Sequence, residues 1–176
     1  ISSYMFSNTK SLKQIDLPAT IEEIRDYAFY ESGLEKIVIP DGVKKINAYA
    51  FGRNTSLKEI HIPNSVTTFG DSILRYSINV EEITMPGHVR LVTLFSSTSA
   101  TYMSKKITKV NVATGSTYVI AEFLYEITHV REVVLPEGLV NIRGSAFYGA
   151  TGLTTINIPA SVETIESSAF YNATGL

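Results

Sequence analysis

The sequence predicts a repeat solenoid, and two observations carry this prediction. The first is a period, because leading aliphatic residues recur at spacings of 22, 23, 23, 27, 23, 23 and 23 residues. The second is a pattern, L-x-x-I-x-I-P-x-x-V-x-x-I-x-x-x-A-F, that recurs in register. Periods of roughly 20–50 residues are typical of stacked repeats. We therefore expect one domain over residues 1–176, with partial repeats at both ends. Its seven repeats start at Leu12, Leu34, Leu57, Val80, Ile107, Val130 and Leu153.

The I-x-I segment of each unit predicts a short β-strand with one face turned inward. The proline that follows has no N–H to donate to a ladder, so it ends the strand. No unit can bury its apolar face alone, and the strands should therefore stack in parallel. The predicted strands are Ile15–Leu17, Ile37–Ile39, Ile60–Ile62, Ile83–Met85, Val110–Val112, Val133–Leu135 and Ile156–Ile158.

The remaining part of each unit should return the chain to the next strand. The V-x-x-I segment is expected to cross the back of the coil. The x-x-x-A-F segment is expected to form a short helical turn, in which alanine allows a tight coil and phenylalanine fills its centre. Short helical turns or second short strands should thus lie opposite the sheet. Equivalent buried points are expected for Phe29, Phe51, Phe147 and Phe170.

One stretch breaks the register. After Val92 the A-F pair should fall on Ser96 and Ser97, and the next unit starts four residues late. Residues 93–106 are therefore expected to leave the coil as a protruding insertion. Two interpretations stay open, because an insertion in a repeat array is either a binding element or tolerated drift.

The two ends of the chain should expose apolar core faces, since neither carries a polar capping segment. Further repeats or domains of the same chain are expected to continue the array.

Composition excludes several classes of function. The chain has no cysteine, which removes disulfides, thiolate metal sites and cysteine nucleophiles. Its net charge is −2 without a block of like charge, so nucleic acid and anionic lipid are not expected partners. No apolar run approaches the ~20 residues of a membrane span.

His61, His88 and His129 lie in different repeats and are expected to be solvated. We expect no enzyme, no cofactor and no metal site.

The repeat resembles the BspA-type leucine-rich repeats, with Leu34–Phe51 and Val130–Phe147 as specimens. This resemblance implies a right-handed leucine-rich-repeat superhelix with one parallel strand per repeat of about 23 residues. It also implies a secreted or cell-surface location, because such repeats are similar to regions of surface proteins of host-associated microbes. One departure is the family's frequent cysteine after A-F, which is Asn54, Ala150 or Ala173 here. A second is the missing asparagine after the strand, so that turn needs other hydrogen-bond partners.

Two outward-facing sets of residues bear on binding. The position between the two isoleucines varies in polarity, as suits a protein surface better than a charged polymer. The positions before the first isoleucine alternate in sign between neighbouring units, which favours a self-neutralising ladder over an electrostatic docking site. The candidate partner-binding residues are Lys36, Val38, Glu59, His61, Thr84, Lys109, Asn111, Glu132, Val134 and Asn157.

The leading hypothesis is a non-catalytic scaffold that binds other proteins or surface glycans in adhesion or host interaction. The alternative is a structural spacer within a larger cell-wall-associated protein, which predicts uniform repeats and no exposed apolar cluster on the strand face. Tyr27, Tyr49, Tyr148 and Tyr171 flank the A-F pair, where packing is favoured over an interface role. Asn54-Thr55-Ser56 matches the N-glycosylation acceptor pattern, which also arises by chance.

Overall fold

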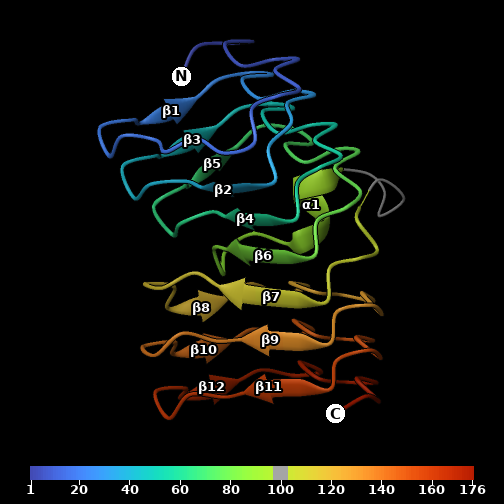
Figure 1. Ribbon diagram of the computed structural model, residues 1–176. Coiled ribbons are helices and arrows are strands. Elements are labelled where there is room, and N and C mark those ends of the chain that lie inside the picture. Colours follow the sequence, from blue (N-terminus) through green and yellow to red (C-terminus); the bar gives the residue numbers. More distant parts are fainter. Residues whose placement is uncertain (97–102) are drawn as a thin grey trace.

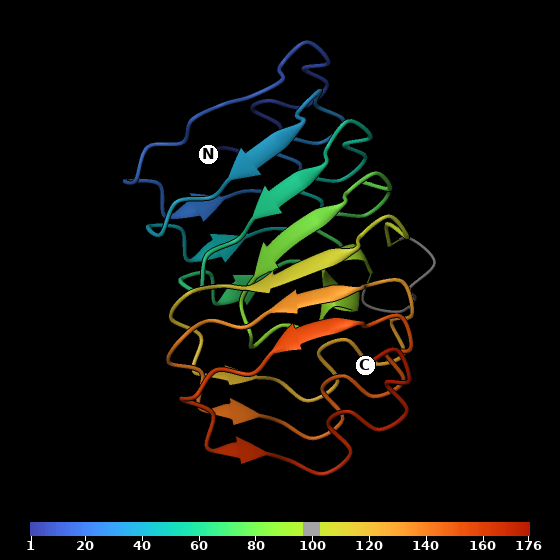
Figure 2. The ribbon, with the colours of Figure 1, turned by 60° about the horizontal axis from the view of Figure 1, so that its bottom comes forward.

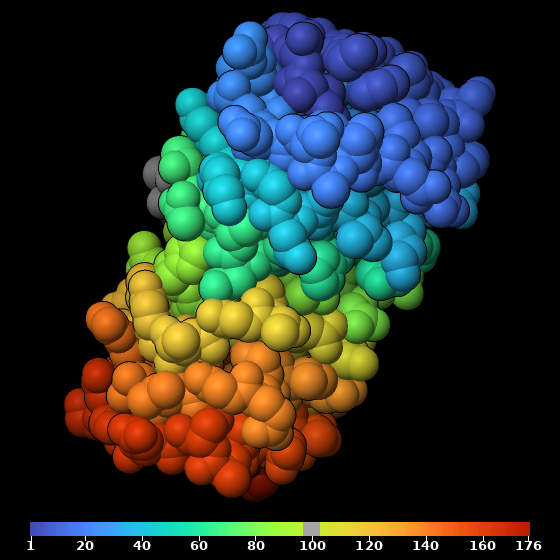
Figure 3. All heavy atoms as spheres, turned by 90° about the vertical axis from the view of Figure 1, so that its left-hand side faces the viewer, coloured from blue at the N-terminus to red at the C-terminus, as the bar shows by residue number. Residues whose placement is uncertain are grey.

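The computed structural model describes residues 1–96 and 103–176 and shows a right-handed β-solenoid (Figure 1). Each coil runs along a front strand, turns, returns across the back and turns again into the next coil. Figure 3 views the edge at which the front strands end and shows the coils stacked in chain order. The predicted fold class is confirmed.

The front of the solenoid is one parallel sheet of six strands in the order β11-β9-β7-β6-β4-β2 (Figure 2). Its register places Ile37, Ile60 and Ile83 opposite one another, and all three are buried. The same inward column continues through Val110, Val133 and Ile156. The strands are β2 (Lys36–Val38), β4 (Glu59–His61), β6 (Glu82–Met85), β7 (Lys109–Val112), β9 (Glu132–Val134) and β11 (Thr155–Asn157).

The back of the solenoid carries the second short strands, in two parallel sheets of three strands each. One sheet contains β1 (Glu23–Ile24), β3 (Lys45–Ile46) and β5 (Thr68–Phe69). The other contains β8 (Tyr118–Val119), β10 (Asn141–Ile142) and β12 (Thr164–Ile165). A short helix, α1 (Leu91–Phe95), follows β6 and lies on the right in Figure 1, away from the back strands. It occupies the A-F turn of its coil, and among the described residues no strand joins the two back sheets at this coil.

Several strand bounds differ from the prediction. The front strands begin one residue before the first isoleucine, and β2, β4, β9 and β11 end one residue before the second. The strands start earlier because the hydrogen bonds between coils start earlier. Lys58 N, for example, donates to Glu35 O of the neighbouring coil at 2.8 Å, before the first isoleucine of either unit. No strand forms at Ile15–Leu17, so that prediction was wrong. The end coil bonds to the next coil at Gly33 N–Thr9 O and Glu35 N–Lys13 O, but no backbone hydrogen bond of the described residues joins residues 15–17 to β2.

The A-F segment is a chain of tight turns rather than the helical turn expected. Ala28 N bonds to Arg25 O and Tyr30 N bonds to Tyr27 O within the coil. The alternate residues bond outward, with Tyr27 N on Ala48 O and Phe29 N on Ala50 O of the next coil. Tyr27 has φ 56°, a left-handed conformation that an α-helix does not contain. Stacking hydrogen bonds therefore override helix formation here.

The phenylalanines fill the coil centres as predicted. Phe29, Phe51 and Phe147 are fully buried. Phe170 is only half-buried, because it stacks on Phe147 at 5.1 Å and on no ring at its other face. Burial of such rings in a close-packed stack is the main source of stability.

The irregular coil departs from the prediction at its turn. Leu74 N donates to Leu94 O at 2.8 Å, as Phe51 N donates to Ile73 O at 2.9 Å. Leu94 and Phe95 thus occupy the A-F place assigned to Ser96 and Ser97, because the path from β6 to the back is shorter in this coil: Gly87 O accepts from Ile120 N at the place that Ile46 holds in the β2 coil. Residues 93–95 belong to this helix, and Met103 and Ser104 are buried. The expected protrusion therefore excludes these residues and the buried Ser96, and its residues 97–102 lie outside the described residues.

Backbone carbonyl groups near the turn after the front strand form hydrogen bonds with serine and histidine side chains, where other leucine-rich repeats use asparagine. Ser65 Oγ donates to Val43 O at 2.9 Å, and Ser161 Oγ donates to Leu139 O at 2.8 Å. His88 Nε2 makes the equivalent contact with Val66 O at 3.1 Å. His88 is half-buried and structural, so the expectation that it is solvated was wrong.

Apolar side chains are exposed on the end coils, including Met5 near one end and Ile165 and Leu176 near the other. This agrees with the expected open core faces. The continuation of the array by further repeats stays a prediction.

Candidate binding surface

The ten candidate residues lie together on the outer face of the front sheet. Strand register aligns Lys36, Glu59, Lys109 and Glu132 in one column, with Glu82 between Glu59 and Lys109. The second column lies two residues further along each strand, on the same face of the sheet. It contains Val38, His61, Thr84, Asn111, Val134 and Asn157.

The charged columns neutralise themselves, as the sign alternation predicted. Lys36 Nζ lies 2.8 Å from Glu59 Oε1, and Lys109 Nζ lies 3.6 Å from Glu82 and 3.8 Å from Glu132. The neighbouring column repeats the arrangement, with ion pairs at Lys13–Glu35 and Lys58–Glu81. Exposed pairs of this kind contribute only about 0–1 kcal/mol each. They remove net charge from the face more than they stabilise the fold.

The second column, which runs from Val38 to Asn157, contains both polar and apolar side chains. Val38 is 52% exposed and Val134 is 41% exposed. Asn111 Nδ2 donates to Glu82 Oε1 at 2.7 Å and contacts Thr84 Oγ1 at 3.4 Å. Apolar side chains thus stand free at two points, with a fixed polar group between them. Such a pattern can bury apolar area and still specify orientation by hydrogen bonds.

His61 is half-buried on this face and its pKa is lowered. Burial is the main cause, and the nearby carboxylates of Asp41 and Glu59 oppose it. Lowering the pKa of an imidazole keeps it neutral at physiological pH, so it can both donate and accept a hydrogen bond. The prediction that His61 faces outward holds, although it is less solvated than expected.

The face is shallowly hollowed across four strands. A depression of about 430 Å³ is lined by Glu59, Glu82, Lys109, Glu132 and their neighbours in the adjacent column. Acidic and basic side chains alternate around it, so it offers no field of one sign. It could bind a mixed polar surface but is not built to concentrate a charged small molecule.

Other chemistry finds little support in the described part of the chain. Within residues 1–96 and 103–176, no three histidine, aspartate or glutamate side chains gather as a metal site would require. No helix of that part is long and apolar enough to cross a bilayer. His129 is half-buried rather than solvated, and burial lowers its pKa. Its Nε2 atom has no hydrogen-bond partner, which is a packing cost and not a metal site.

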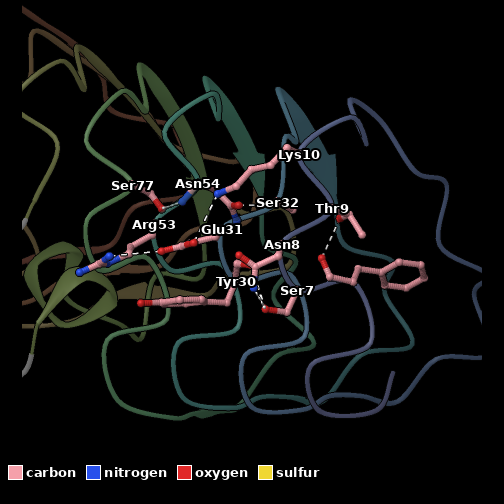
Figure 4. A network of polar contacts seen from close by, with 11 residues as sticks. Ser7, Asn8, Thr9, Lys10, Tyr30, Glu31, Ser32, Arg53, Asn54 and Ser77 are labelled. Atoms are coloured by element: carbon pink, nitrogen blue, oxygen red, sulfur yellow. Dashed lines mark hydrogen bonds and ion pairs between the residues drawn. The ribbon is translucent and has the colours of Figure 1, made fainter.

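A buried polar column was not foreseen from the sequence. Ser32, Asn54, Ser77 and Ser104 are buried at the place where the family often has cysteine. Ser32 Oγ donates to Asn54 Oδ1 at 2.8 Å (Figure 4), and Ser77 Oγ donates to Phe51 O at 2.7 Å. Asn54 is therefore not accessible for glycosylation in the folded chain, and that match to the acceptor pattern is fortuitous.

The turn edge that leads into the front strands carries further side chains that the sequence reasoning missed. The second residue after the phenylalanine place is Glu31, Arg53 and Tyr76 in successive coils. Comparing this column between units is the signal that could have found them. Tyrosines at the flanking places stack, with Tyr27 and Tyr49 centroids 5.1 Å apart. Packing of these tyrosines, which the sequence favoured, is confirmed.

Comparison with known proteins supports the same architecture. The family described as "BspA type Leucine rich repeat region" matches residues 1–94 and 92–176, in 6 copies. A leucine-rich repeat protein from Eubacterium ventriosum is 28% identical with a TM-score of 0.61, over 88% of this chain and 41% of that one. The chain thus spans less than half of that protein. A search of the curated proteins finds no match.

Two further solved structures resemble the chain more weakly. The pneumococcal vaccine antigen PcpA is 25% identical with a TM-score of 0.37, covering 86% of this chain and 46% of that one. A leucine-rich cell surface protein of Faecalibacterium prausnitzii is 20% identical with a TM-score of 0.35, covering 99% and 55%.

Proposed function

The chain belongs to the BspA-type leucine-rich repeat family, and from this premise we propose that it is a non-catalytic binding scaffold of a secreted or cell-surface protein. Its partners are other proteins or surface glycans, in adhesion or host interaction. The face that binds them is the outer face of the front sheet. The observation that carries the proposal is the outward column from Val38 to Asn157, which is varied, continuous over six strands, exposed at Val38, Val134 and Asn157 and half-buried between.

The physical argument rests on what this column leaves free. The inward column consists of isoleucine and valine only, because stacking fixes it. The outward column is not constrained in this way, and it combines exposed Val38 and Val134 with His61 and Asn111. Apolar contact supplies affinity, and polar groups at fixed spacing supply specificity. Ion pairs on one side of the column keep the face from attracting charged polymers in general.

The test uses two defined probe sets, a display library of random dodecapeptides and an array of glycans. The variant Val38→Glu with Val134→Glu places two charges in the outward column. Its matched control is Thr68→Glu with Thr164→Glu, which places two charges on exposed back-strand positions. Binding of selected probes should fall by about 10-fold or more in the first variant, the effect of disrupting an interface centre. It should be unchanged in the control.

Two outcomes would count against the proposal. Retention of no probe from either set would favour the spacer, whose function needs no ligand. Probes that bind equally well to both double variants would move the binding site away from the front sheet.

A further inference from the structure

The turn edge of the first four coils carries a hollow that is separate from the front face. Its volume is about 360 Å³. Figure 4 shows Lys10, Glu31 and Arg53 side by side on this edge, each from a different coil. The lining residues are Lys10, Glu31, Arg53, Thr55, Tyr76 and Ile78. Repetition brings them together, because each occupies the same turn of its own coil.

The charge of this hollow is predominantly positive. Glu31 accepts from Lys10 Nζ at 3.3 Å and from Arg53 Nη1 at 3.2 Å, so one carboxylate lies between two cations. Arg75 lies beside the hollow, with its Cζ atom 5.2 Å from the Tyr76 ring centroid and its Nη1 donating to Tyr49 OH at 3.3 Å. Both Lys10 and Arg53 keep more than half of their side-chain surface exposed. The chain as a whole has a net charge of −2, so this local excess of cations is not an average property.

The rim of the hollow extends the positive charge through hydrogen bonds. Asn79 Nδ2 donates to Thr55 O at 2.7 Å, and Lys106 Nζ donates to Asn79 Oδ1 at 2.7 Å. Lys106 is thereby held next to a lining residue. Lys10 and Arg53 in the hollow and Arg75 and Lys106 beside it are thus set against two carboxylates, Glu31 in the hollow and Glu81, which interacts with Lys106.

The hollow also presents apolar surface. Ile78 is 51% exposed and Tyr76 is 38% exposed. The Arg53 Cζ atom lies 5.3 Å from the Tyr76 ring centroid, close enough for a cation–π contact that holds both groups in place. Tyrosine and arginine are the residue types that most often dominate binding energy at protein interfaces. An exposed isoleucine beside them gains free energy only if an apolar group covers it.

We propose that this hollow binds a segment of a partner protein in which carboxylates flank a large apolar side chain. The carboxylates pair with Lys10, Arg53 and the rim cations, and the apolar side chain covers Ile78 beside the Tyr76 ring. A nucleic acid fits less well, because its sugar-phosphate backbone offers no apolar group to cover Ile78. This inference adds a second surface to the front face and is independent of it.

The experiment measures fluorescence anisotropy with a labelled decapeptide that has aspartates and glutamates on both sides of Phe-Leu. Arg53→Glu should weaken binding by about 10-fold or more, as removal of an interface arginine does. Ile78→Ser should weaken it by several-fold. The matched control is Lys44→Glu, an equal change of charge at an exposed lysine away from this edge, which should leave binding unchanged. Thermal midpoints of all variants check that each one folds.

Three results would overturn the inference. One is the absence of saturable binding at low ionic strength. Another is equal affinity for a decapeptide with Ser-Ser in place of Phe-Leu, or for a decathymidylate, because either would show an unspecific cationic patch. The third is an equal loss in the Lys44→Glu control. The double variant Val38→Glu with Val134→Glu separates this inference from the front-face proposal. It should not alter binding of this decapeptide, whatever it does to binding at the front sheet.

Discussion

The ring of Phe51 lies parallel to the ring of Phe29, with the centroids 5.3 Å apart and 4° between the planes. Both are fully buried, so each ring is packed within the stack of successive coils. Phe51→Ala should lower the free energy of unfolding by about 3–5 kcal/mol, because the stack cannot collapse into the cavity. Denaturant titration measures this. Phe51→Leu is the matched control and should cost less, since Leu74 fills the equivalent place in the next coil. A loss under ~1 kcal/mol for Phe51→Ala would contradict the packing role.

Ser77 is the central link of the buried polar column. Its Oγ accepts from Asn54 N at 3.0 Å and donates to Phe51 O at 2.7 Å. Ser77→Ala should cost about 1–3 kcal/mol, because it leaves two buried backbone groups without partners. Ser11→Ala, at an exposed serine, serves as the control and should change stability by less than ~0.5 kcal/mol. Equal stabilities for the two variants would show that solvent satisfies these groups instead.

Ser145 occupies the left-handed place before the A-F pair, with φ 56°. Ser145→Gly should raise the thermal midpoint, because relief of about 1–2 kcal/mol of backbone strain exceeds the ~0.4–1 kcal/mol of added unfolded-chain entropy. Ser145→Val should lower it, since a β-branched side chain fits this conformation poorly. Calorimetry on the three proteins decides the point. A lower midpoint for the glycine variant would mean that the left-handed place carries no strain.

The Glu23 carboxylate has its pKa lowered from 4.5 to about 2. The main cause is the hydrogen bond from Asn47 Nδ2 at 2.8 Å, followed by those from Arg25 and Lys45. A depressed pKa favours the folded state above pH 4.5, and this contribution is lost as pH falls from 4.5 to about 2. Carboxyl NMR titration of the folded protein should show Glu23 ionised at pH 3. Asn47→Ala should raise its midpoint. A wild-type midpoint near 4.5 would refute the arrangement.

The candidate binding face was predictable because it follows from register. Once Ile37 and Ile60 are known to stack inward, Val38 and His61 must share the outer face. Lys36 and Glu59 carry opposite charges at equivalent places, so stacking of their coils is enough to bring them together as an ion pair. The turn-edge hollow was not predicted: Arg53 and Tyr76 share one place in the repeat, but residue type varies at that place, and only the folded turns show that the two side chains meet.

The sequence by itself determined the repeat period and the inward column, because these depend on a pattern repeated in every unit. Only the tertiary structure decided the conformation of the A-F turn. Tyr27 adopts a left-handed φ there, and its N–H donates to Ala48 O of the next coil. The tertiary structure also decided that Leu94 and Phe95 replace the pair assigned to Ser96 and Ser97. Hydrogen bonds and packing between coils are non-local, and a local pattern cannot specify them.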